Sequence, residues 1–569
     1  MTGRDYHDRT IHSPASVRTS GHTLEWDIKP FPFKVYSDLA AIPLPRDLDP
    51  LATDTLTALA GAQAPTASLT LEGLAAVLFY AAGVTRKKTY PGGGEILFRA
   101  AASTGALYQT EVYVAVGEMA GLEPGLYHFC PGDFALRRLR SGDVRRAMAT
   151  AAADESLATR AATVLLTAIY WRNTWKYQAR GYRHLFWDSG TMLANALAVA
   201  GALGLAPRVL TGFVDMDVNR LLGLDTAREA ALELVALGPE TAPAPPLGAL
   251  DAIEHPTLPL SSSEVDYPLL HEIHAASSLD SPDAVRAWRS GAGSRGGGAP
   301  AATALAAVRG GDSEDAAVGS DPDYRGRGRD PTAPTPSAQL PAGRTAESSA
   351  NVARRIEQDT SVIALPAPRA LSGRGLGETI HRRGSTRQFS HAAITADELG
   401  TALWAAARGF DADVPAGLVD IYLVVNAVEG VPPGAYFYQP GAHALERLAA
   451  GDFRNRSSYL CLEQPLGGDA AAVVYFLARL DPLLRAFGAR GYRLANLEAG
   501  LAGGRAYLAA YAQRFGASGL TFYDRLVVEF FSPHAAGKDA IFVTALGRSV
   551  AEGRATIESN LILPRRSSG

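Results

Sequence analysis

The sequence is organised around residues 171–195, which read WRNTWKYQARGYRHLFWDSGTMLAN. This stretch carries two side chains that can move protons, Lys176 and Tyr177, shortly before an Arg-Gly-Tyr-Arg frame. The frame returns in residues 483–500, LLRAFGARGYRLANLEAG, where alanine and phenylalanine replace the lysine and the tyrosine. We therefore interpret the chain as two versions of one module with one working site between them.

Composition and charge narrow the class of protein. The chain has 569 residues, too many for a single hydrophobic core, and its apolar share of 47% is typical of a globular protein. Its formal net charge of −4 does not provide the basic field that a nucleic-acid partner requires. Two cysteines are too few for a disulfide framework or a four-thiolate metal site, so no metal is expected. The polar N-terminus and the lack of long apolar runs predict a cytoplasmic protein without a signal peptide or membrane span.

Apolar spacing predicts the same series of elements twice. Each module is expected to contain an early helix, a strand, a β-meander and a closing strand. The paired segments are 68–83 with 394–409, 111–116 with 420–425, 121–143 with 430–452, and 230–238 with 540–547. A repeat of this size is typical of fused homologues whose copies pack as a pseudo-dimer.

Composition also sets the boundaries between the parts of the chain. The first segment is mixed and punctuated by proline, so it predicts an irregular arm laid over a domain. The long segment between the modules has few large apolar side chains, and such a segment cannot offset the entropy of ordering its chain. The predicted division is an arm at 1–50, a first domain at 51–246, a connecting segment at 247–289, a disordered linker at 290–352, a second domain at 353–558 and a tail at 559–569.

A basic cluster opens the second module in residues 381–389, HRRGSTRQF. Arg382, Arg383 and Arg387 offer planar donor groups. Ser385 adds a hydroxyl, and the combination suits a phosphate monoester. Considered alone, such a cluster is more often a solvated, basic helix start.

The first module has a loop of small residues at 99–106, RAAASTGA. Small side chains allow a flat ligand to approach the backbone, and Ser103 and Thr104 can donate hydrogen bonds to it. A tight loop before a strand is the commoner explanation of this pattern. Ordinary surface residues near an interface are likewise the commoner explanation of the Lys-Tyr pair.

The two modules differ in a complementary way, and this difference favours the functional interpretation. In the second module the positions of the small loop are occupied by Ala412, Asp413 and Val414. The first module has no arginine cluster before its first helix, where residues 58–68 read ALAGAQAPTAS. Complementary losses are expected if one shared site remains and its twin has decayed.

Both modules resemble the nitroreductase-like flavoproteins. The whole chain is similar to a tandem member of the SagB/ThcOx-type dehydrogenases, the FMN-dependent azoline oxidases of ribosomal-peptide biosynthesis. WKYQARGYRHLFWDSG follows the family pattern Trp-Lys-Tyr…Arg-x-Tyr-Arg…Asp-x-Gly, and RAAASTGALYQ follows Ser-x-Gly-Ala-Leu-Tyr-Pro, with Ala102 and Gln109 where proline is usual. HRRGSTRQF resembles the flavin-phosphate motif Arg-Arg-Ser-x-Arg with Gly384 inserted. The resemblance implies an α+β fold of two FMN-binding domains packed as an intramolecular pseudo-dimer, each with a mixed, mainly antiparallel sheet wrapped by helices.

The resemblance also implies that FMN lies at the interface and is bound by both modules. The second module would supply Arg382, Arg383, Ser385, Arg387, the turn of Ser518, Gly519 and Leu520, and Arg548. The first module would supply Ser103, Thr104, Gly105 and Ala106. Its own counterpart of Arg548 is Pro239, which agrees with a decayed second site. The family implicates the Lys-Tyr pair in azoline oxidation, so Lys176 and Tyr177 are the predicted catalytic residues.

The implied reaction is hydride transfer to FMN from a peptide thiazoline or oxazoline, while Tyr177 or Lys176 removes a proton and oxygen reoxidises the cofactor. The implied partners are a heterocyclised precursor peptide and a cyclodehydratase complex. Three alternatives remain: an NAD(P)H-dependent FMN nitro- or quinone reductase, an oxidase of another natural-product intermediate, and a non-catalytic scaffold subunit of a peptide-modifying complex. The Lys-Tyr pair argues against the reductase.

Overall fold

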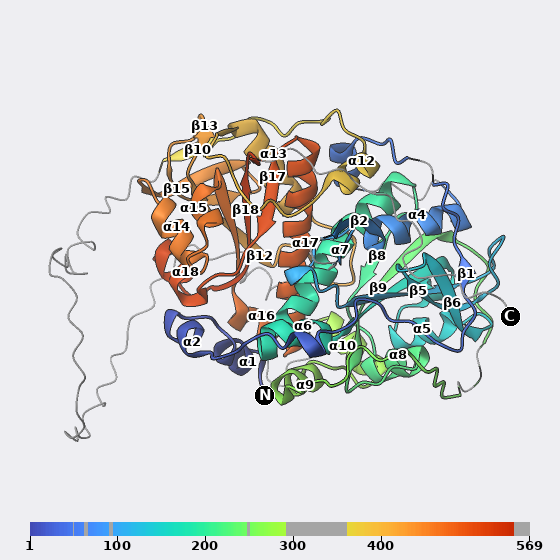
Figure 1. Cartoon of the computed structure of the whole chain (residues 1–569). Helices are drawn as coiled ribbons and strands as arrows, with labels where there is room; N and C mark the ends of the chain where they lie inside the picture. Colours follow the sequence, from blue (N-terminus) through green and yellow to red (C-terminus); the bar gives the residue numbers. More distant parts are fainter. Residues whose placement is uncertain are drawn as a thin grey trace, which may run out of the picture.

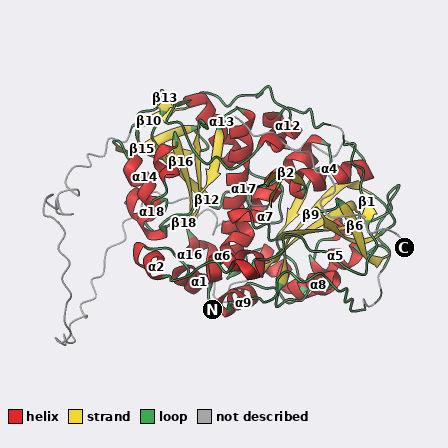
Figure 2. Ribbon diagram, in the orientation of Figure 1, coloured by secondary structure: helices red, strands yellow, loops and turns green. Residues whose placement is uncertain are grey.

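The computed structural model describes residues 1–48, 50–61, 67–89, 95–246, 248, 251–291 and 361–550. In these residues the chain forms two modules, each built on a seven-stranded sheet with helices packed around it (Figures 1 and 2). The predicted linker, apart from residues 290 and 291, and the predicted tail lie outside the described residues. None of the helices in the described ranges combines the length and the apolar character that crossing a membrane requires.

The two sheets have the same strand order, and every neighbouring pair of strands in them is antiparallel. The first runs β1 (Ile42–Pro43), β6 (Ala135–Ser141), β5 (Gly125–Cys130), β4 (Thr110–Val116), β7 (Arg160–Ile169), β9 (Glu229–Glu240) and β8 (Arg208–Leu210). The second runs β10 (Val362–Ala364), β15 (Ala444–Ala450), β14 (Gly434–Gln439), β12 (Val419–Val425), β16 (Ala472–Ala478), β18 (Asp539–Gly547) and β17 (Gly516–Gly519). Two small sheets add β2 (Val84–Thr89) with β3 (Glu95–Arg99), and β11 (Ile394–Thr395) with β13 (Val428–Glu429). The position-by-position match confirms the predicted duplication.

The helices also repeat between the modules. Those up to the end of the first module are α1 (Gly3–Arg9), α2 (Pro14–Thr19), α3 (Thr55–Leu59), α4 (Leu71–Ala82), α5 (Arg145–Ala151), α6 (Tyr170–Tyr177), α7 (Gly181–Ala202) and α8 (Asp215–Leu222). Next come α9 (Pro268–Ala276) and α10 (Pro282–Arg289), and then α12 (Leu376–Arg382), α13 (Ala396–Ala407), α14 (Arg454–Leu460), α15 (Pro465–Asp469), α16 (Leu480–Phe487), α17 (Arg490–Ala512) and α18 (Asp524–Phe531). The predicted early helices are α4 and α13, and each begins at a threonine whose side chain accepts a backbone N–H of the first turn.

Helices α7 and α17 pack against each other at the centre of the molecule, between the two sheets (Figure 1). Glycine is required at their contact. A Cβ added to Gly190 would lie 2.5 Å from the carbonyl oxygen of Leu497, and one added to Gly500 would lie 2.4 Å from that of Trp187. The glycines that recur in the two copies of the frame therefore allow the two backbones to touch.

The Arg-Gly-Tyr-Arg frame joins the modules through buried ion pairs. In the first copy, Nη1 of Arg183 lies 2.6 Å from Asp524 of the second module, and Nη1 of Arg180 lies 3.1 Å from the same carboxylate. The second copy mirrors this arrangement with the residues Arg490, Arg493 and Asp215. Each copy of the frame thus holds a carboxylate of the opposite module.

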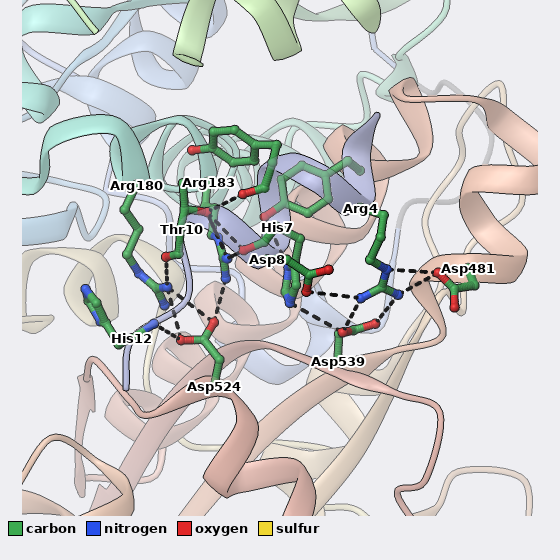
Figure 3. Close-up of polar contacts among 12 residues, drawn as sticks. Arg4, His7, Asp8, Thr10, His12, Arg180, Arg183, Asp481, Asp524 and Asp539 are labelled. Carbon is green, nitrogen blue, oxygen red and sulfur yellow. Dashed lines mark hydrogen bonds and ion pairs between the residues drawn. The ribbon is translucent and has the colours of Figure 1, made fainter. Parts of the chain in front are cut away.

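The N-terminal arm is more regular than predicted, because two local caps favour helices. Thr2 begins α1 with a capping box, and Ser13 does the same for α2. The arm is fixed by the frame, since Arg180 donates to the carbonyl oxygen of Thr10 (2.6 Å) and Arg183 to that of His7 (2.8 Å; Figure 3). It therefore forms part of the contact between the modules.

A second arm precedes the second module, within the segment predicted as a connector. Arg493 donates to the carbonyl oxygen of His274 (3.0 Å), and Arg490 to that of Ser277 (3.0 Å). The N–H of Leu279 donates to Asp215 (2.9 Å), just as the N–H of His12 donates to Asp524 (2.8 Å). The duplicated unit therefore includes an arm, and α9 is the counterpart of α1.

Candidate functional site

The small-residue loop of the first module is held by one carboxylate of α7. Asp188 accepts hydrogen bonds from the hydroxyl of Ser103 (2.5 Å) and from the N–H (2.9 Å) and hydroxyl (2.6 Å) of Thr104. Burial raises the pKa of Asp188 to about 6, against the lowering effect of these bonds. Gly105 has a φ of 64°, and a Cβ there would lie 2.9 Å from the hydroxyl of Tyr177. The loop thus lies directly beside the Lys-Tyr pair.

Lys176 and Tyr177 end α6, and their surroundings shift their pKa values in opposite directions. Burial and the charge of Arg387 lower the pKa of Lys176. Burial and the charge of Asp188 raise the pKa of Tyr177, although Arg387 opposes this. The ring of Tyr177 meets that of His184 edge-on, with 4.4 Å between centroids. This environment destabilises the charged ammonium of Lys176 and the charged phenolate of Tyr177.

The basic cluster divides into two kinds of arginine. Arg383 is buried and crosses the interface, where it donates to the carbonyl oxygens of Ala100 (2.9 Å) and Arg99 (3.0 Å). Arg382 is half-exposed and Arg387 is exposed. Arg383 therefore fastens the second module to the start of the small loop, while Arg382 pairs with Glu378 of its own helix and Arg387 faces solvent.

Gly384, the residue inserted in the family pattern, makes room for an arginine of the first module. A Cβ built on Gly384 would lie 3.0 Å from Nη1 of Arg86, on β2. The hydroxyl of Ser385 lies 3.3 Å from that of Tyr507, on α17. The same tyrosine hydroxyl accepts the N–H of Gly519. Arg86 and Tyr507 thus extend the cluster that the sequence indicates.

The predicted turn and Arg548 lie along the neighbouring edge of the second sheet. The N–H of Thr386 donates to the carbonyl oxygen of Ala517 (2.8 Å), which ties the cluster to β17. Ser518 is buried, and its hydroxyl has no hydrogen-bond partner in the described part of the chain. Arg548 pairs with Glu398 at 2.7 Å and leaves about a third of its side chain exposed. All the predicted residues of the second module therefore share one edge.

The two sets of predicted residues meet across the interface. The charge of Arg387, from the second module, acts on both Lys176 and Tyr177 of the first. Arg383 and Arg86 cross the same boundary in opposite directions. We call this part of the interface, defined by Ser103–Ala106, Lys176, Tyr177, Arg382–Arg387, Gly519 and Arg548, the Lys-Tyr side.

The equivalent part of the interface, which we call the twin side, contains Phe487 at the position of Tyr177 and Asp413 at that of Thr104. Asp413 accepts the N–H groups of Thr211 (2.8 Å) and Gly212 (2.9 Å) of the first module. It also pairs with Arg289 at 3.1 Å. The second-module loop is thereby bonded to the segment that follows β8, the first module's counterpart of β17.

A different arginine lies on the twin side. Arg505 of α17 donates to the carbonyl oxygens of Arg408 and Gly409, which correspond to the pair that Arg383 binds on the Lys-Tyr side. Arg505 is buried, and it belongs to the same module as the carbonyls it binds. The twin side is therefore closed by the protein's own hydrogen bonds.

Four residues at the Lys-Tyr side had no role in the sequence prediction, namely Asp188, Arg86, His184 and Tyr507. The duplication offered a signal for Asp188, because the equivalent residue of α17, Glu498, is also a carboxylate. In the structure, Glu498 accepts the N–H groups of Gly417 (3.0 Å) and Leu418 (2.6 Å). Arg86 has no such signal, since its contact with Gly384 joins distant parts of the chain.

Fold and site together define the class of this protein. The chain belongs to the nitroreductase family, a family of oxidoreductases, and carries two copies of the family's domain in tandem. The profile described as "Nitroreductase family" matches residues 60–238 and 380–534, which is more than half of the chain.

Individual relatives include proteins from an archaeon and two bacteria. The chain is 31% identical over 171 residues to the nitroreductase-designated protein MJ1384 of Methanocaldococcus jannaschii, which covers 30% of this chain and 81% of that protein. It is 30% identical over 138 residues to the microcin B17-processing protein McbC of Escherichia coli, which covers 23% of this chain and 50% of McbC. A crystal structure of a nitroreductase-designated protein from Anabaena variabilis matches 96% of this chain and 99% of its own, with a TM-score of 0.68 and 25% identity.

Nitroreductase-family proteins generally bind FMN, and the residues of the Lys-Tyr side fit that group. Guanidinium groups and a hydroxyl suit its phosphate. Gly105 is exposed and has a left-handed backbone, and the side chains of the loop are small, which suits the approach of a flat ring to the backbone. The unpartnered, buried hydroxyl of Ser518 adds a polar group beside the Gly519 turn.

Proposed function

We propose that this protein is an FMN-dependent dehydrogenase that oxidises thiazolines or oxazolines in a peptide to thiazoles or oxazoles. The two modules act as an intramolecular pseudo-dimer with one composite FMN site on the Lys-Tyr side. The observation that carries the proposal is the position of Lys176 and Tyr177 beside the small loop of one module and within the field of Arg387 from the other. The similarity to McbC, a microcin B17-processing protein, supports a peptide substrate.

Residues of both modules would hold FMN. In the second module these are Arg382, Ser385, Arg387, the backbone at Gly519 and Leu520, and Arg548; Arg383 would fix their distance from the first module. In the first module they are Ser103, Thr104, Gly105 and Ala106, with Arg86 added by the structure. FMN, when bound, supplies the hydride acceptor that azoline oxidation requires.

Proton removal is assigned to Lys176. A base must be unprotonated before it accepts a proton, and the lowered pKa of Lys176 favours its neutral amine. The raised pKa of Tyr177 keeps its phenol protonated, so Tyr177 donates a hydrogen bond that orients the ring. Leu107 and Trp175 pack with Leu24 and Ile28 of the arm around Tyr177, and this apolar cover keeps water from the reacting atoms.

The proposed base predicts a pH dependence that Arg387 controls. Its positive charge favours the neutral amine, so Arg387→Gln is expected to raise the pKa of Lys176. The ascending limb of kcat against pH would then move to higher pH. Steady-state rates at saturating FMN measure this shift. Arg382→Gln is the matched control, because Arg382 pairs with Glu378 and does not contribute to the pKa shift of Lys176; an equal displacement in both variants would contradict the assignment.

Oxidation of a defined peptide tests the function itself. The purified chain, reconstituted with FMN, is expected to hold one FMN per chain by absorbance. With a thiazoline or oxazoline peptide under air, mass spectrometry is expected to show the loss of two hydrogens per ring.

The outcomes separate the competing functions. Rapid reduction of the flavin by NAD(P)H without peptide oxidation would favour a nitro- or quinone reductase. A chain that takes up no FMN would favour a scaffold, and two FMN per chain would contradict the composite site. A heterocyclised precursor peptide and a cyclodehydratase are the partners that this function implies, and co-purification with a cyclodehydratase would test the second.

A further inference from the structure

Helices α2 and α10 are equivalent parts of the two arms. The stretch Ser-Pro-x-x-Val-Arg occurs in both, at residues 13–18 and 281–286. In each, the serine side chain accepts a backbone N–H of the first turn, from Ser16 (3.0 Å) and from Ala284 (3.2 Å). Both helices follow the segment that is anchored to a carboxylate of the opposite module. The packing of α10 on the twin side therefore shows how a helix at this position of an arm can fit against the modules.

Helix α10 places an aromatic ring in the interface of the twin side. The indole of Trp288 is buried, with its centroid 5.6 Å from that of Phe487 and 5.7 Å from the guanidinium of Arg490. Its Nε1–H donates to the carbonyl oxygen of Phe487 (3.0 Å). Gly212 is required beside the ring, because a Cβ there would lie 2.6 Å from it. The twin side thus contains a slot for a flat ring, lined by an arginine, an aromatic side chain and a backbone acceptor.

At the equivalent positions on the Lys-Tyr side, the sequence has Tyr177 in place of Phe487 and Arg180 in place of Arg490. The guanidinium of Arg180 lies 5.5 Å from the ring centroid of Phe522 and 6.0 Å from that of Trp187. Helix α2 buries none of its residues, and the exposed Ser20 stands at the position of Trp288. The arginine and an aromatic side chain are therefore kept at these two positions, while the ring that α10 supplies on the twin side has a small exposed residue in its place on α2.

Arg180 retains one donor, Nε, that its counterpart has used, whereas Nη2 is without a partner in both arginines within the described residues. Nε of Arg490 donates to the carbonyl oxygen of Thr211 (2.8 Å). Arg180 is only 5% exposed, yet within the described residues its Nε and Nη2 have no hydrogen-bond partner. A buried guanidinium with two free N–H groups normally has a partner. It is three residues from Tyr177, and its charge acts on His184, which contacts Tyr177.

We propose that the slot lined by Arg180 and Tyr177 binds the substrate's own five-membered ring, in the way that the twin side binds the indole of Trp288. The ring lies against the guanidinium of Arg180, whose free donors bind the peptide carbonyl next to the ring. This rests on the proposed function, because it takes a peptide azoline as the substrate. It adds Arg180 as a residue that determines specificity for flat heterocycles, and it places the ring within reach of Lys176.

Two variants of the FMN-loaded full chain test the slot, with affinity for a thiazole-containing product peptide as the readout. Ser20→Trp gives α2 the residue that α10 uses, and it is expected to raise the Kd by about tenfold or more with the FMN content unchanged. Arg18→Trp is the matched control, because the equivalent Arg286 is exposed and an indole there points away from the slot. Arg180→Lys keeps the charge that faces Asp524 but loses the planar donors, so it is also expected to raise the Kd by about tenfold.

The outcomes distinguish the slot from the function. Equal affinity of the Ser20→Trp and Arg18→Trp variants for the peptide would overturn the slot, and so would wild-type affinity of the Arg180→Lys variant. In either case, oxidation of the peptide by the wild-type chain would still uphold the proposed function. A wild-type chain that holds FMN but neither oxidises azoline peptides nor binds their products would refute the proposed function itself.

Discussion

Replacement of Lys176 by methionine is expected to lower kcat for azoline oxidation by about two to four orders of magnitude, the usual contribution of a positioned general base. Methionine keeps most of the side-chain volume, so α6 and the small loop should be preserved. The ascending limb of the pH–rate profile should disappear with the amine, because the lowered pKa of Lys176 is its proposed origin. Stopped-flow reduction of the bound flavin by substrate measures the step directly.

Two comparisons make this result specific. Lys87→Met removes a lysine that pairs with Glu95 on the exposed β2–β3 hairpin, and it should leave the rate unchanged. Tyr177→Phe removes one hydrogen bond and should cost only about tenfold. A larger loss in Tyr177→Phe than in Lys176→Met would reverse the two roles. Full activity in both variants would remove the Lys-Tyr pair from the mechanism.

Replacement of Asp524 by asparagine is expected to lower the free energy of unfolding by about 3–5 kcal/mol, since it leaves two buried guanidinium groups without their counter-charge. Asp524 is 2% exposed and faces Arg180 and Arg183 (Figure 3). It also accepts the N–H of His12, so the same change should release the arm. Denaturant unfolding monitored by tryptophan fluorescence gives the energy, and proteolysis of the arm gives the local effect.

The pH dependence of this contribution follows from the pKa of Asp524. Burial alone would raise that pKa, but Arg180 and Arg183 outweigh it and lower it to about 2. A carboxyl whose pKa is lowered by folding stabilises the protein above its ordinary pKa, and this stabilisation is lost as the pH falls towards 2. Asp524→Asn should therefore reduce the acid dependence of unfolding in that range. Asp539→Asn, which affects the more exposed pair with Arg4, should cost about 1 kcal/mol or less; equal losses would contradict the buried-pair explanation.

Much of the fold follows from local patterns in the sequence. The early helices carry apolar residues at helical spacing after a threonine cap, and both form as predicted. The strands of the β-meander lie between turns and form neighbouring strands of each sheet. The N-terminal arm was predicted less well, because its apolar content is low and its two helices depend on short capping interactions and on the frame of the first module.

The structure brings predicted residues of both modules to one part of the interface, but the sequence did not predict which contacts each of them makes. The motifs name Arg383 as a phosphate donor, but it binds backbone carbonyls across the interface. Asp188, which appears in the sequence as part of a frame, organises the small loop. Such assignments depend on which groups meet across two modules, and no local pattern contains that information.

The sequence by itself determined that this protein is a duplicated α+β module whose copies carry different residues at equivalent positions, because a duplication remains visible residue by residue. Only the tertiary structure decided what the frame around Lys176 and Tyr177 does. Its glycines bring two central helices into backbone contact, and its arginines neutralise carboxylates of the opposite module. These contacts exist only after both modules have folded, because distance in space, rather than position in the chain, sets which charges and hydrogen-bonding groups can pair.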